Sequence, residues 1–501
     1  MSKGAHSSAI SLVDLAAKLA RVGAELQGSG ATLVTDVRQD SRSVEPGDVF
    51  AARVGATIDG TRFIPEAIRR GASALLVEQR TSLPLVAVPV LSVRDLRLGI
   101  ALAAEAVHGH PSREVEVVAI TGTNGKTTIA WLTEHALMRA GYPTGRLGTL
   151  GYSCGGDRVD SPLTTPEADV VSRSIASARR AGATHFVLEA SSHALSQARV
   201  DALSLAVAVF TNLTQDHLDY HHDMGAYAAA KRRLFIDLQP RASVINVDDL
   251  FGADLAREAK GKVLRVSRHP GADVYPRAVE GGTEGITATA VSPHGEVVLR
   301  SRLVGEHNLD NLLAVVGIAC ALDLNVPEVV AALEQVPSVP GRLERCDGPE
   351  DDVVVLVDYA HTPDALERAL AAVRGLASRD LICVFGCGGD RDPDKRPKMG
   401  TAVGKAATRA IISNDNPRTE DPVQIANMVE PAVRACGIPY DVVLDRAQAI
   451  EKAVLEARAG DVVLIAGKGH EDYQIIGTKK RSFDDRVEAR RALARRRGGE
   501  L

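Results

Sequence analysis

Short apolar runs alternate with helical patterns along most of this chain. The run 115–120, VEVVAI, is typical of a buried strand, and the residues after Lys126 keep a helical spacing without glycine or proline until Gly141. Further apolar runs end at Glu189 and at Phe210. Because strands that alternate with helices favour parallel sheets, the pattern predicts an α/β protein.

The first part of the chain predicts a small α/β unit whose elements are short and separated by turn signals. We expect helices at 11–20, 64–71 and about 94–108, and strands at 34–38, 49–53, 74–78 and about 85–91. Asp40-Ser41-Arg42 lies in this unit. It is equally compatible with a surface turn and with a binding site.

The last third of the chain alternates strand and helix most regularly. Before it, residues 272–305 predict an antiparallel insert, and residues 336–345, which contain two prolines and a glycine, predict a linker. After the linker, apolar runs that end in polar loops are separated by expected helices at 363–375, about 397–407, 421–435 and 446–459. This succession is typical of a mostly parallel, Rossmann-like sheet.

A glycine-rich loop, Thr121-Gly122-Thr123-Asn124-Gly125-Lys126-Thr127-Thr128, joins the strand 115–120 to its helix. Glycines allow backbone N–H groups to approach a phosphate, and the helix N-terminus adds a positive end. In such loops the lysine reaches the terminal phosphates and the following hydroxyl binds Mg²⁺. The glycine spacing is shorter than in the common pattern, and the alternative is an ordinary strand-to-helix turn.

The fold is therefore predicted to be α/β with three domains, in line with a length of 501 residues. Residues 1–112 form a small α/β domain. Residues 113–340 form a central P-loop ATPase-type domain with a parallel sheet and the antiparallel insert. Residues 341–501 form the C-terminal Rossmann-like domain.

Composition narrows the class of protein. The net charge of -5 gives no broad basic surface for nucleic acid, and six scattered cysteines suit a reducing compartment. No basic region followed by an apolar run opens the chain, and an apolar run such as 203–210 is too short to cross a bilayer. We expect a cytoplasmic monomer without nucleic-acid partner or membrane insertion.

Polar side chains follow the central strands where each strand ends. Glu189 and His217 come after two apolar runs, and ligands bind at that edge of an open parallel sheet. Either residue alone would usually be an ordinary loop residue. Lys231 lies in a helical run, where a lysine is ordinarily solvated, and Asn308 and Asn311 are one turn apart and could read an adenine edge or cap their helix.

Four polar loops follow strands of the last third, at 358–361, 386–392, 415–418 and 467–471. Loops of α/β proteins are polar in general. Four of them at one sheet edge, with Arg391, Arg418 and Glu471 among their residues, favour a site for a zwitterionic ligand.

Motifs along nearly the whole chain resemble those of the Mur ligases of peptidoglycan synthesis. They are TGTNGKTT at 121–128, EASSH at 189–193, TNLTQDHLDYH at 211–221, HNLDN at 307–311, GR at 341–342, DYAHTP at 358–363, GCGGDRD at 386–392, DNPR at 415–418 and GKGHE at 467–471. The glycine loop is shared with folate polyglutamate ligases, and DNPR and GKGHE discriminate better.

The resemblance implies an ATP-dependent ligation of 2,6-diaminopimelate to UDP-N-acetylmuramoyl-L-alanyl-D-glutamate in peptidoglycan precursor synthesis. ATP would phosphorylate the D-glutamate γ-carboxylate, and the diaminopimelate amine would displace phosphate from the acyl phosphate. A carboxylate is a poor electrophile, so phosphorylation supplies a leaving group. Mg²⁺ and Lys126 would offset charge during transfer.

The resemblance also implies roles for individual residues. The catalytic set is Lys126, Glu189, His217 and Lys231, and the metal set is Thr127, Glu189, His217 and Lys231 as a carbamate. ATP would contact Gly122, Thr123, Asn124, Gly125, Lys126, Thr127, Thr128, Asn308, Asn311, Arg342 and Asp358. The UDP-muramoyl dipeptide would contact Ser41, Thr164, Thr165, Ser191, Gln197 and Arg199, and diaminopimelate would contact Arg391, Asp415, Asn416, Pro417, Arg418, Gly467 and Glu471.

Diaminopimelate differs from lysine by a second carboxylate, which a guanidinium can bind with two hydrogen bonds. Arg418, rigidified by Pro417, is the expected partner. One arginine recognises either carboxylate, so the sequence does not separate meso- from LL-diaminopimelate. The sequence differs from that of relatives at residues 56–58, Ala-Thr-Ile, and at Leu163. These differences put individual contacts with the uridine and the dipeptide in question.

Three other functions remain open at this point. A folate polyglutamate ligase should lack DNPR and GKGHE. A P-loop ATPase or kinase with a sensor domain would hydrolyse ATP without both substrates. A non-catalytic nucleotide-binding protein would not need the whole metal set. For a ligase, domain closure across 336–345 is expected, because ATP and the amine would be held by different domains.

Overall fold

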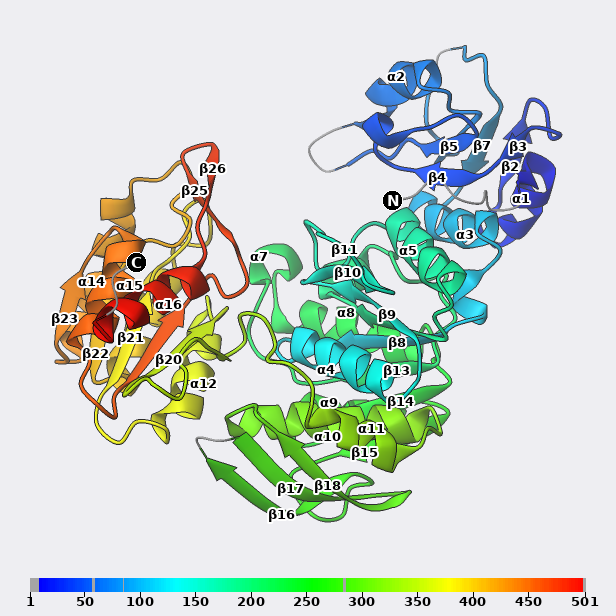
Figure 1. Ribbon diagram of the computed structural model, residues 1–501. Helices are drawn as coiled ribbons and strands as arrows, with labels where there is room; N and C mark the ends of the chain where they lie inside the picture. The colour runs from blue at the N-terminus through cyan, green and yellow to red at the C-terminus, as the bar shows by residue number, and fades with distance from the viewer. Residues whose placement is uncertain (1–8, 56–58, 84, 283–284, 499–501) are drawn as a thin grey trace.

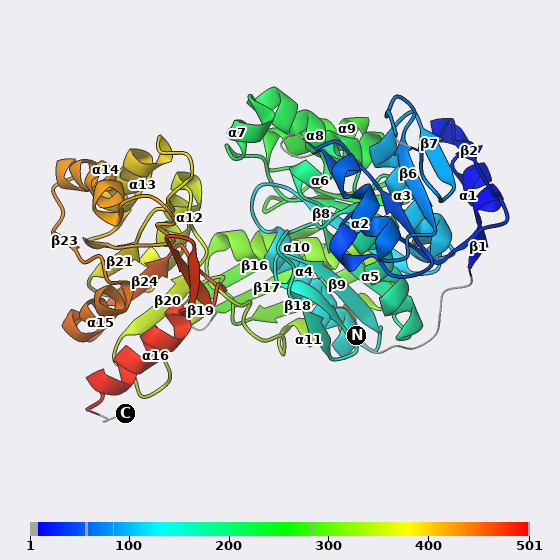
Figure 2. The same ribbon diagram turned by 90° about the horizontal axis from the view of Figure 1, so that it is seen from above.

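The computed structural model describes residues 9–55, 59–83, 85–282 and 285–498. The chain forms three α/β domains, which Figure 1 shows in blue, in cyan to green, and in yellow to red. Figure 2 shows the C-terminal domain on one side and the N-terminal domain packed against the central domain on the other. The departure at 56–58 lies outside the described residues, and the exact domain limits stay a prediction.

The N-terminal domain has a five-stranded sheet in the order β2-β7-β6-β5-β4. The strands are β2 Glu25–Gln27, β4 Asp36–Arg38, β5 Asp48–Ala51, β6 Ala74–Glu78 and β7 Val90–Val93, and the helices are α1 Leu12–Lys18, α2 Ile64–Arg69 and α3 Leu96–Val107. All strand pairs but β2 with β7 are parallel. The strand expected at 85–91 begins only at Val90, after Pro89, which has no N–H to donate to a ladder.

The central domain has an eight-stranded sheet in the order β11-β10-β9-β12-β8-β13-β14-β15. Its strands are β8 Glu116–Thr121, β9 Thr144–Gly148, β10 Gly151–Cys154, β11 Asp157–Val159, β12 His185–Glu189, β13 Val207–Phe210, β14 Ala242–Asn246 and β15 Lys262–Val266. Glu189 pairs with Ile120, and Phe210 pairs with Thr121, so three parallel strands end at one level. This register brings the loops that follow them together.

Two apolar cores cover the two faces of the central sheet. One contains α4 Lys126–Arg139, α10 Glu306–Ala321 and α11 Val326–Leu333, and the other contains α5 Ala168–Arg180, α8 Met224–Ile236 and α9 Leu250–Glu258. The short helices α6 Ser192–Ser196 and α7 Leu218–His221 follow β12 and β13. The predicted insert is confirmed as an antiparallel sheet of β16 Tyr275–Gly282, β17 Gly285–Ser292 and β18 Gly295–Ser301.

The C-terminal domain has a six-stranded sheet in the order β19-β20-β24-β21-β22-β23, parallel except for β19. The strands are β19 Glu344–Arg345, β20 Val354–Asp358, β21 Leu381–Phe385, β22 Arg409–Ile412, β23 Tyr440–Val442 and β24 Val462–Ala466. The helices are α12 Pro363–Arg374, α13 Lys395–Ala406, α14 Pro422–Ala435, α15 Arg446–Glu456 and α16 Asp485–Arg496. The Rossmann-like arrangement is confirmed, and a hairpin of β25 Tyr473–Ile476 and β26 Lys479–Ser482 is added to it.

The six cysteines all lie in the described part of the chain and are free thiols. Cys383 and Cys387 are buried, as expected from their place beside a strand end. Within the described ranges, no helix combines the length and the apolar character needed to cross a bilayer.

Candidate functional site

The glycine loop fits tightly between β8 and α4. Gly122 and Gly125 have φ values of 147° and 88°, which L side chains rarely adopt. A Cβ at Gly122 would collide with the hydroxyl of Thr211, and a Cβ at Gly125 would lie 2.6 Å from the Asn311 side-chain oxygen. Both positions therefore require glycine.

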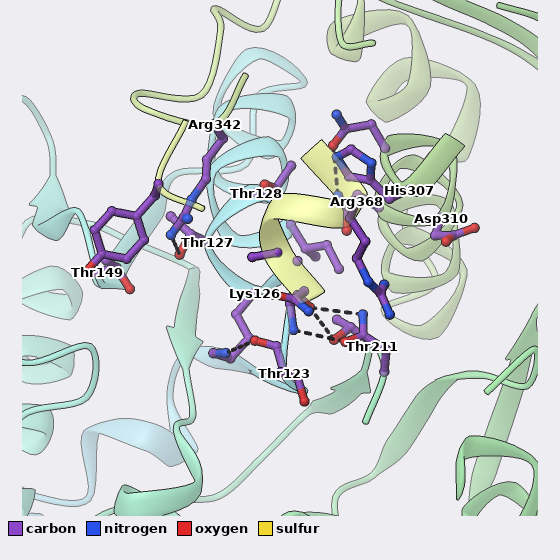
Figure 3. Close-up of a pocket in the computed structure, with 18 of the residues that line it drawn as sticks. Thr123, Lys126, Thr127, Thr128, Thr149, Thr211, His307, Asp310, Arg342 and Arg368 are labelled. Carbon is purple, nitrogen blue, oxygen red and sulfur yellow. Dashed lines mark hydrogen bonds between the residues drawn. The ribbon is translucent and has the colours of Figure 1, made fainter. Parts of the chain in front are cut away.

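A cavity of about 290 Å³ opens over this loop, between the central and C-terminal domains. Figure 3 shows Arg342 reaching toward Thr127 on one side, and Arg368 of α12 lying beside His307 and Asp310 on the other. Many of the predicted nucleotide and metal residues line this single cavity; they are Thr123, Asn124, Gly125, Lys126, Thr127, Thr128, Glu189, His217, Asn308, Asn311, Arg342 and Asp358.

Glu189 is a fixed carboxylate in the wall of the cavity. Its side chain is 0% exposed and accepts hydrogen bonds from the Thr127 hydroxyl at 2.9 Å and from the Thr149 N–H at 2.8 Å. The Thr149 hydroxyl donates a further bond at 3.1 Å. A Cβ at Gly148 would collide with the Glu189 carboxylate, so this position of β9 requires glycine.

Two lysine amines converge on one carbonyl oxygen at the back of the loop. The Nζ of Lys126 donates to the Gly122 carbonyl at 2.9 Å, and the Nζ of Lys231 donates to the same oxygen at 2.8 Å. Lys231 is only 1% exposed, so the ordinary expectation of a solvated helix lysine is wrong here. Burial, and then the charge of Lys126, hold the pKa of Lys231 well below its usual range.

His217 caps α7 in a left-handed conformation with φ 54°, and its ring lies 4.9 Å from that of His193. Asn308 donates to the Val304 carbonyl at 2.8 Å, and Asn311 donates to the Asn308 side-chain oxygen at 2.9 Å. Both asparagines line the cavity, and the N-cap of α10 is Gly305 without a side-chain cap bond, so neither Asn308 nor Asn311 caps the helix start.

Arg342 and Asp358 are residues of the C-terminal domain that line the cavity. The Arg342 guanidinium donates to the Thr127 hydroxyl at 3.3 Å and lies 4.7 Å from the centre of the Tyr359 ring. Asp358 accepts hydrogen bonds from the backbone of Leu343 and Ala360, which fixes it at the end of β20.

Most of the residues predicted to bind the UDP-muramoyl dipeptide form one hydrogen-bonded cluster beside Glu189. The Thr165 hydroxyl donates to the Glu189 carbonyl at 2.6 Å, and Arg199 donates to the Thr165 carbonyl at 2.6 Å. The other members are Thr164, Ser191 and Gln197, bonded to Thr149, Thr165 and Arg199 respectively. Ser41 is not in this cluster and donates instead to Glu66 in the N-terminal domain.

The residues predicted to bind diaminopimelate lie together in the C-terminal domain, outside the cavity. Asn416 donates to the Glu471 carboxylate at 2.9 Å, which joins the DNPR and GKGHE loops. Arg418 has φ 53°, and its guanidinium donates to the Gly389 carbonyl at 2.8 Å. Gly467 has φ 122° and packs against Asp415, whereas Arg391 is exposed. Three loops distant in sequence thus form one polar site.

Sequence reasoning missed three residues that structure this region. Lys468 is 0% exposed and donates to Glu471 at 2.9 Å, although it lies inside the motif GKGHE. Thr149 holds Glu189, and Asp364 of α12 contacts the glycine loop. Lys468 lies within the motif GKGHE, and Asp364 directly follows the motif DYAHTP. Their position in or next to these motifs could have identified them from the sequence.

The cavity contains oxygen donors that suit Mg²⁺, a hard cation. Mg²⁺ is usually bound through one or two carboxylates and substrate phosphates while it keeps several waters. Glu189 and the Thr127 hydroxyl, 2.9 Å apart beside the phosphate loop, fit such an ion. In the described part of the chain, no group of three or more acidic, histidine or cysteine side chains could hold a metal ion.

Comparison with known proteins agrees with this geometry. Residues 120–319 match the Mur ligase middle domain, residues 341–469 match the Mur ligase glutamate ligase domain, and residues 33–108 match the Mur ligase family catalytic domain. The chain belongs to the Mur ligase family, whose members are ATP-dependent ligases that form amide bonds.

Several similar relatives have the same name. The UDP-N-acetylmuramoyl-L-alanyl-D-glutamate–2,6-diaminopimelate ligase of Gloeobacter violaceus is 45% identical over 96% of this chain and 98% of its own length. The ligase of the same name from Synechococcus elongatus is 46% identical over 92% and 94%. A solved structure of that name superposes with a TM-score of 0.70 at 32% identity, covering 98% and 99%. A MurF from Acinetobacter baumannii, at 18% identity, has the same fold with a TM-score of 0.67 over 93% and 97%.

Proposed function

We propose that this protein joins 2,6-diaminopimelate to UDP-N-acetylmuramoyl-L-alanyl-D-glutamate, with ATP converted to ADP and phosphate, in peptidoglycan precursor synthesis. The observation that carries the proposal is the joining of DNPR and GKGHE into one polar site by Asn416 and Glu471, in a chain that also holds a complete phosphate loop. Relatives that are more than 40% identical bear the name of this activity. The cytoplasmic location and the monomeric state stay predictions.

The nucleotide would occupy the cavity between the central and C-terminal domains. The backbone from Gly122 to Thr128 and the amine of Lys126 would bind its phosphates, and Asn308, Asn311, Arg342 and Asp358 would bind the rest of ATP. Support comes from their position around a single cavity. Thr127, Glu189 and His217 would hold Mg²⁺, which when bound offsets phosphate charge during transfer.

Lys231 would act as a carbamate. Burial lowers the pKa of the Lys231 amine and so favours its unprotonated form, and an unprotonated amine can add to carbon dioxide with release of one proton. The product is an anion, which replaces the repulsion between Lys126 and Lys231 by attraction and can serve as a metal ligand. The convergence of both amines on the Gly122 carbonyl supports this role.

The two other substrates would bind on either side of the nucleotide. The hydrogen-bonded cluster at Thr164, Thr165, Ser191, Gln197 and Arg199 would hold the dipeptide end of the UDP substrate, and Ser41 would contact its nucleotide end in the N-terminal domain. In the C-terminal domain, Asp415 and Glu471 would bind an ammonium of diaminopimelate, and Arg391 and Arg418 would bind a carboxylate, with Asn416, Pro417 and Gly467 shaping the site.

The reaction would proceed in two steps. The γ-carboxylate of D-glutamate attacks the γ-phosphorus of ATP, the bond to the bridging oxygen breaks, and ADP leaves. The amine of diaminopimelate then attacks the acyl phosphate, loses a proton, and expels phosphate. Lys126 stabilises charge on the phosphoryl group in the first step.

The proposal is tested by measuring ADP release with each substrate omitted in turn. We expect rapid ADP release only when the UDP-muramoyl dipeptide and diaminopimelate are both present. ATP hydrolysis that is indifferent to both would favour an ATPase with a sensor domain, and extension of a folate by glutamate would favour a folate polyglutamate ligase. Heavy oxygen placed in the γ-carboxylate should appear in the released phosphate, because that oxygen leaves with the phosphoryl group.

A further inference from the structure

Asp364 of the C-terminal domain is bonded to the glycine loop of the central domain. It lies in the first turn of α12, and its Oδ2 accepts a hydrogen bond from the Asn124 side-chain amide at 3.1 Å. The same oxygen accepts a second bond from the Thr214 hydroxyl at 3.0 Å. The other carboxylate oxygen, Oδ1, accepts from Arg368, one turn further along α12, at 3.2 Å.

The position of Asp364 has an ordinary explanation that does not account for these bonds. Acidic residues are common in the first turn of a helix, where they interact with the positive end of their own helix dipole. The cap of α12 is already supplied by Thr362, whose hydroxyl accepts from the Ala365 N–H. Both hydrogen bonds to the Asp364 Oδ2 come from loops of the central domain.

The two loops that Asp364 contacts are joined to each other. The Thr123 hydroxyl donates to the Thr214 carbonyl at 3.1 Å, and the Thr214 N–H donates to the Thr123 hydroxyl at 3.0 Å. One loop follows β8 and carries Lys126, and the other follows β13 and carries His217. Asp364 therefore holds α12 against the phosphate loop and the His217 loop at the same time.

We propose that Asp364 is a positioning residue that couples docking of the C-terminal domain to the geometry of the phosphate site. It acts through Asn124 and Thr214 and does not itself line the cavity. The inference rests on the proposed function, in which the amine is delivered by the C-terminal domain to an acyl phosphate formed on the central domain. Arg342 makes a second bridge, to Thr127, but it belongs to the nucleotide cavity.

This role predicts a defect in turnover and not in nucleotide binding. Lys126 and Thr127 remain in place without Asp364, so the affinity for ATP should be kept. The productive arrangement of the two domains should become less populated, because a charged acceptor with two donors is lost. We expect Asp364→Ala to lower kcat about tenfold, the size of one hydrogen bond to a charged group, with little change in the KM for ATP.

The decisive experiment is a double-mutant cycle in the ligase assay with all three substrates. Its variants are Asp364→Ala, Thr214→Val and the two combined, with Asp364→Asn as the conservative replacement. Glu367→Ala, an exposed acidic residue on the same helix, is the matched control and should behave like the wild type. Melting temperatures of all variants are compared with that of the wild type.

The proposal expects the double variant to lose no more kcat than Asp364→Ala alone, because the Thr214 hydroxyl would have no partner left. It also expects Asp364→Asn, which keeps an acceptor oxygen, to retain most of the activity. Losses that multiply in the double variant, or an unchanged kcat in Asp364→Ala, would overturn it. If Asp364→Ala does not fold, Thr214→Val alone decides: it removes one of the donors to the Asp364 carboxylate and should lower kcat with an unchanged KM for ATP, and an unchanged kcat would overturn the proposal.

The wild-type control separates this inference from the function on which it rests. If the wild type forms no diaminopimelate adduct, the proposed function fails. If the wild type forms the adduct and the variant effects are independent, only the role of Asp364 fails.

Discussion

The amine of Lys231 donates a hydrogen bond of 2.8 Å to the carbonyl of Gly122, the first glycine of the phosphate loop. The bond links a buried helix residue to the loop from behind, and Lys126 shares the same acceptor. Two cations at one oxygen repel each other. Conversion of Lys231 to a carbamate would remove the repulsion and add an anion to the site.

Carbamylation of Lys231 can be detected directly. We expect protein equilibrated with isotope-labelled bicarbonate to give one carbamate signal by nuclear magnetic resonance. Lys231→Met should lack the signal and nearly all ligase activity, since a carbamate cannot form. Lys260→Met, a change at another lysine of the central domain, should keep both. A wild-type protein without the signal, yet fully active, would contradict the assignment.

Arg418 should determine the use of diaminopimelate. Its backbone is fixed by hydrogen bonds with Ile475 and Gly477 of the β25–β26 hairpin, and this limits the positions that its guanidinium can take. Loss of one partner of a buried charge pair costs about 2–5 kcal/mol, which is a factor of about tens to thousands in affinity. We expect Arg418→Ala to raise the KM for diaminopimelate by such a factor and to leave ATP binding intact, as measured by steady-state kinetics and nucleotide titration.

Arg434→Ala is the matched control for Arg418, because Arg434 is an exposed arginine of the same domain. Arg434→Ala should change neither the KM for diaminopimelate nor the affinity for ATP. Unaltered kinetics with diaminopimelate in Arg418→Ala would refute the role of this residue.

The ion pair of Arg446 and Asp485 should contribute strongly to the stability of the C-terminal domain. Both side chains are 0% exposed and their charged atoms lie 2.7 Å apart, and Arg446 also donates to the carbonyls of Asn414 and Ala466. Arg446→Met leaves Asp485 buried and unpaired, which typically costs about 3–5 kcal/mol. Denaturant unfolding should reveal a loss of this size, whereas Glu430→Gln, at the pair with the exposed Arg434, should cost far less. Equal losses would contradict this account.

The apolar pattern predicted the three buried strands that carry the site. Glu189 and the residues after Phe210 were expected at one sheet edge, and the register of β8, β12 and β13 aligns them there. The strands β9 and β14 were not expected although they are buried, and β11 was not expected because it is exposed and has no apolar alternation at 157–159. Local pattern therefore predicted some of the buried strands and missed others that are defined by pairing with distant segments.

Side-chain partners distant in sequence explain the other omissions. The helix α16 is rich in arginine, and its charges are paired with residues such as Glu344, Asp352 and Glu451, which no local pattern connects to it. The Lys231 amine bonds to the loop after β8, and the buried Lys468 amine contacts Asn416 in the loop after β22. The candidate site could be assembled from motifs, but the contacts within it could not.

His307 should make the protein less stable in mildly acidic solution. Burial, and then the charges of Arg368 and Arg268, lower the pKa of His307 from 6.5 to about 4. The unfolded chain therefore binds a proton at this residue from pH 6.5 downward while the folded protein does not. Stability from this group is lost as the pH falls from 6.5 to about 4, and below that range no further loss arises from it.

The measurement is the fall in melting temperature between about pH 7 and pH 5, which bracket the upper part of that titration. It should be smaller in His307→Phe, which keeps a ring and cannot be protonated, than in the wild type. His307→Phe removes only this group, so contributions from other titrating residues cancel in the comparison. An equal or larger fall in the variant would show that His307 is not buried in its neutral form.

The most direct test of the central claim is mass spectrometry of the product formed from the UDP-muramoyl dipeptide, ATP and an equimolar mixture of diaminopimelate and lysine. The joined DNPR and GKGHE loops, with Arg418 as the last residue of DNPR, predict a product that carries diaminopimelate almost exclusively. A product that carries lysine in comparable amount, or ADP released without any extended product, would contradict the account.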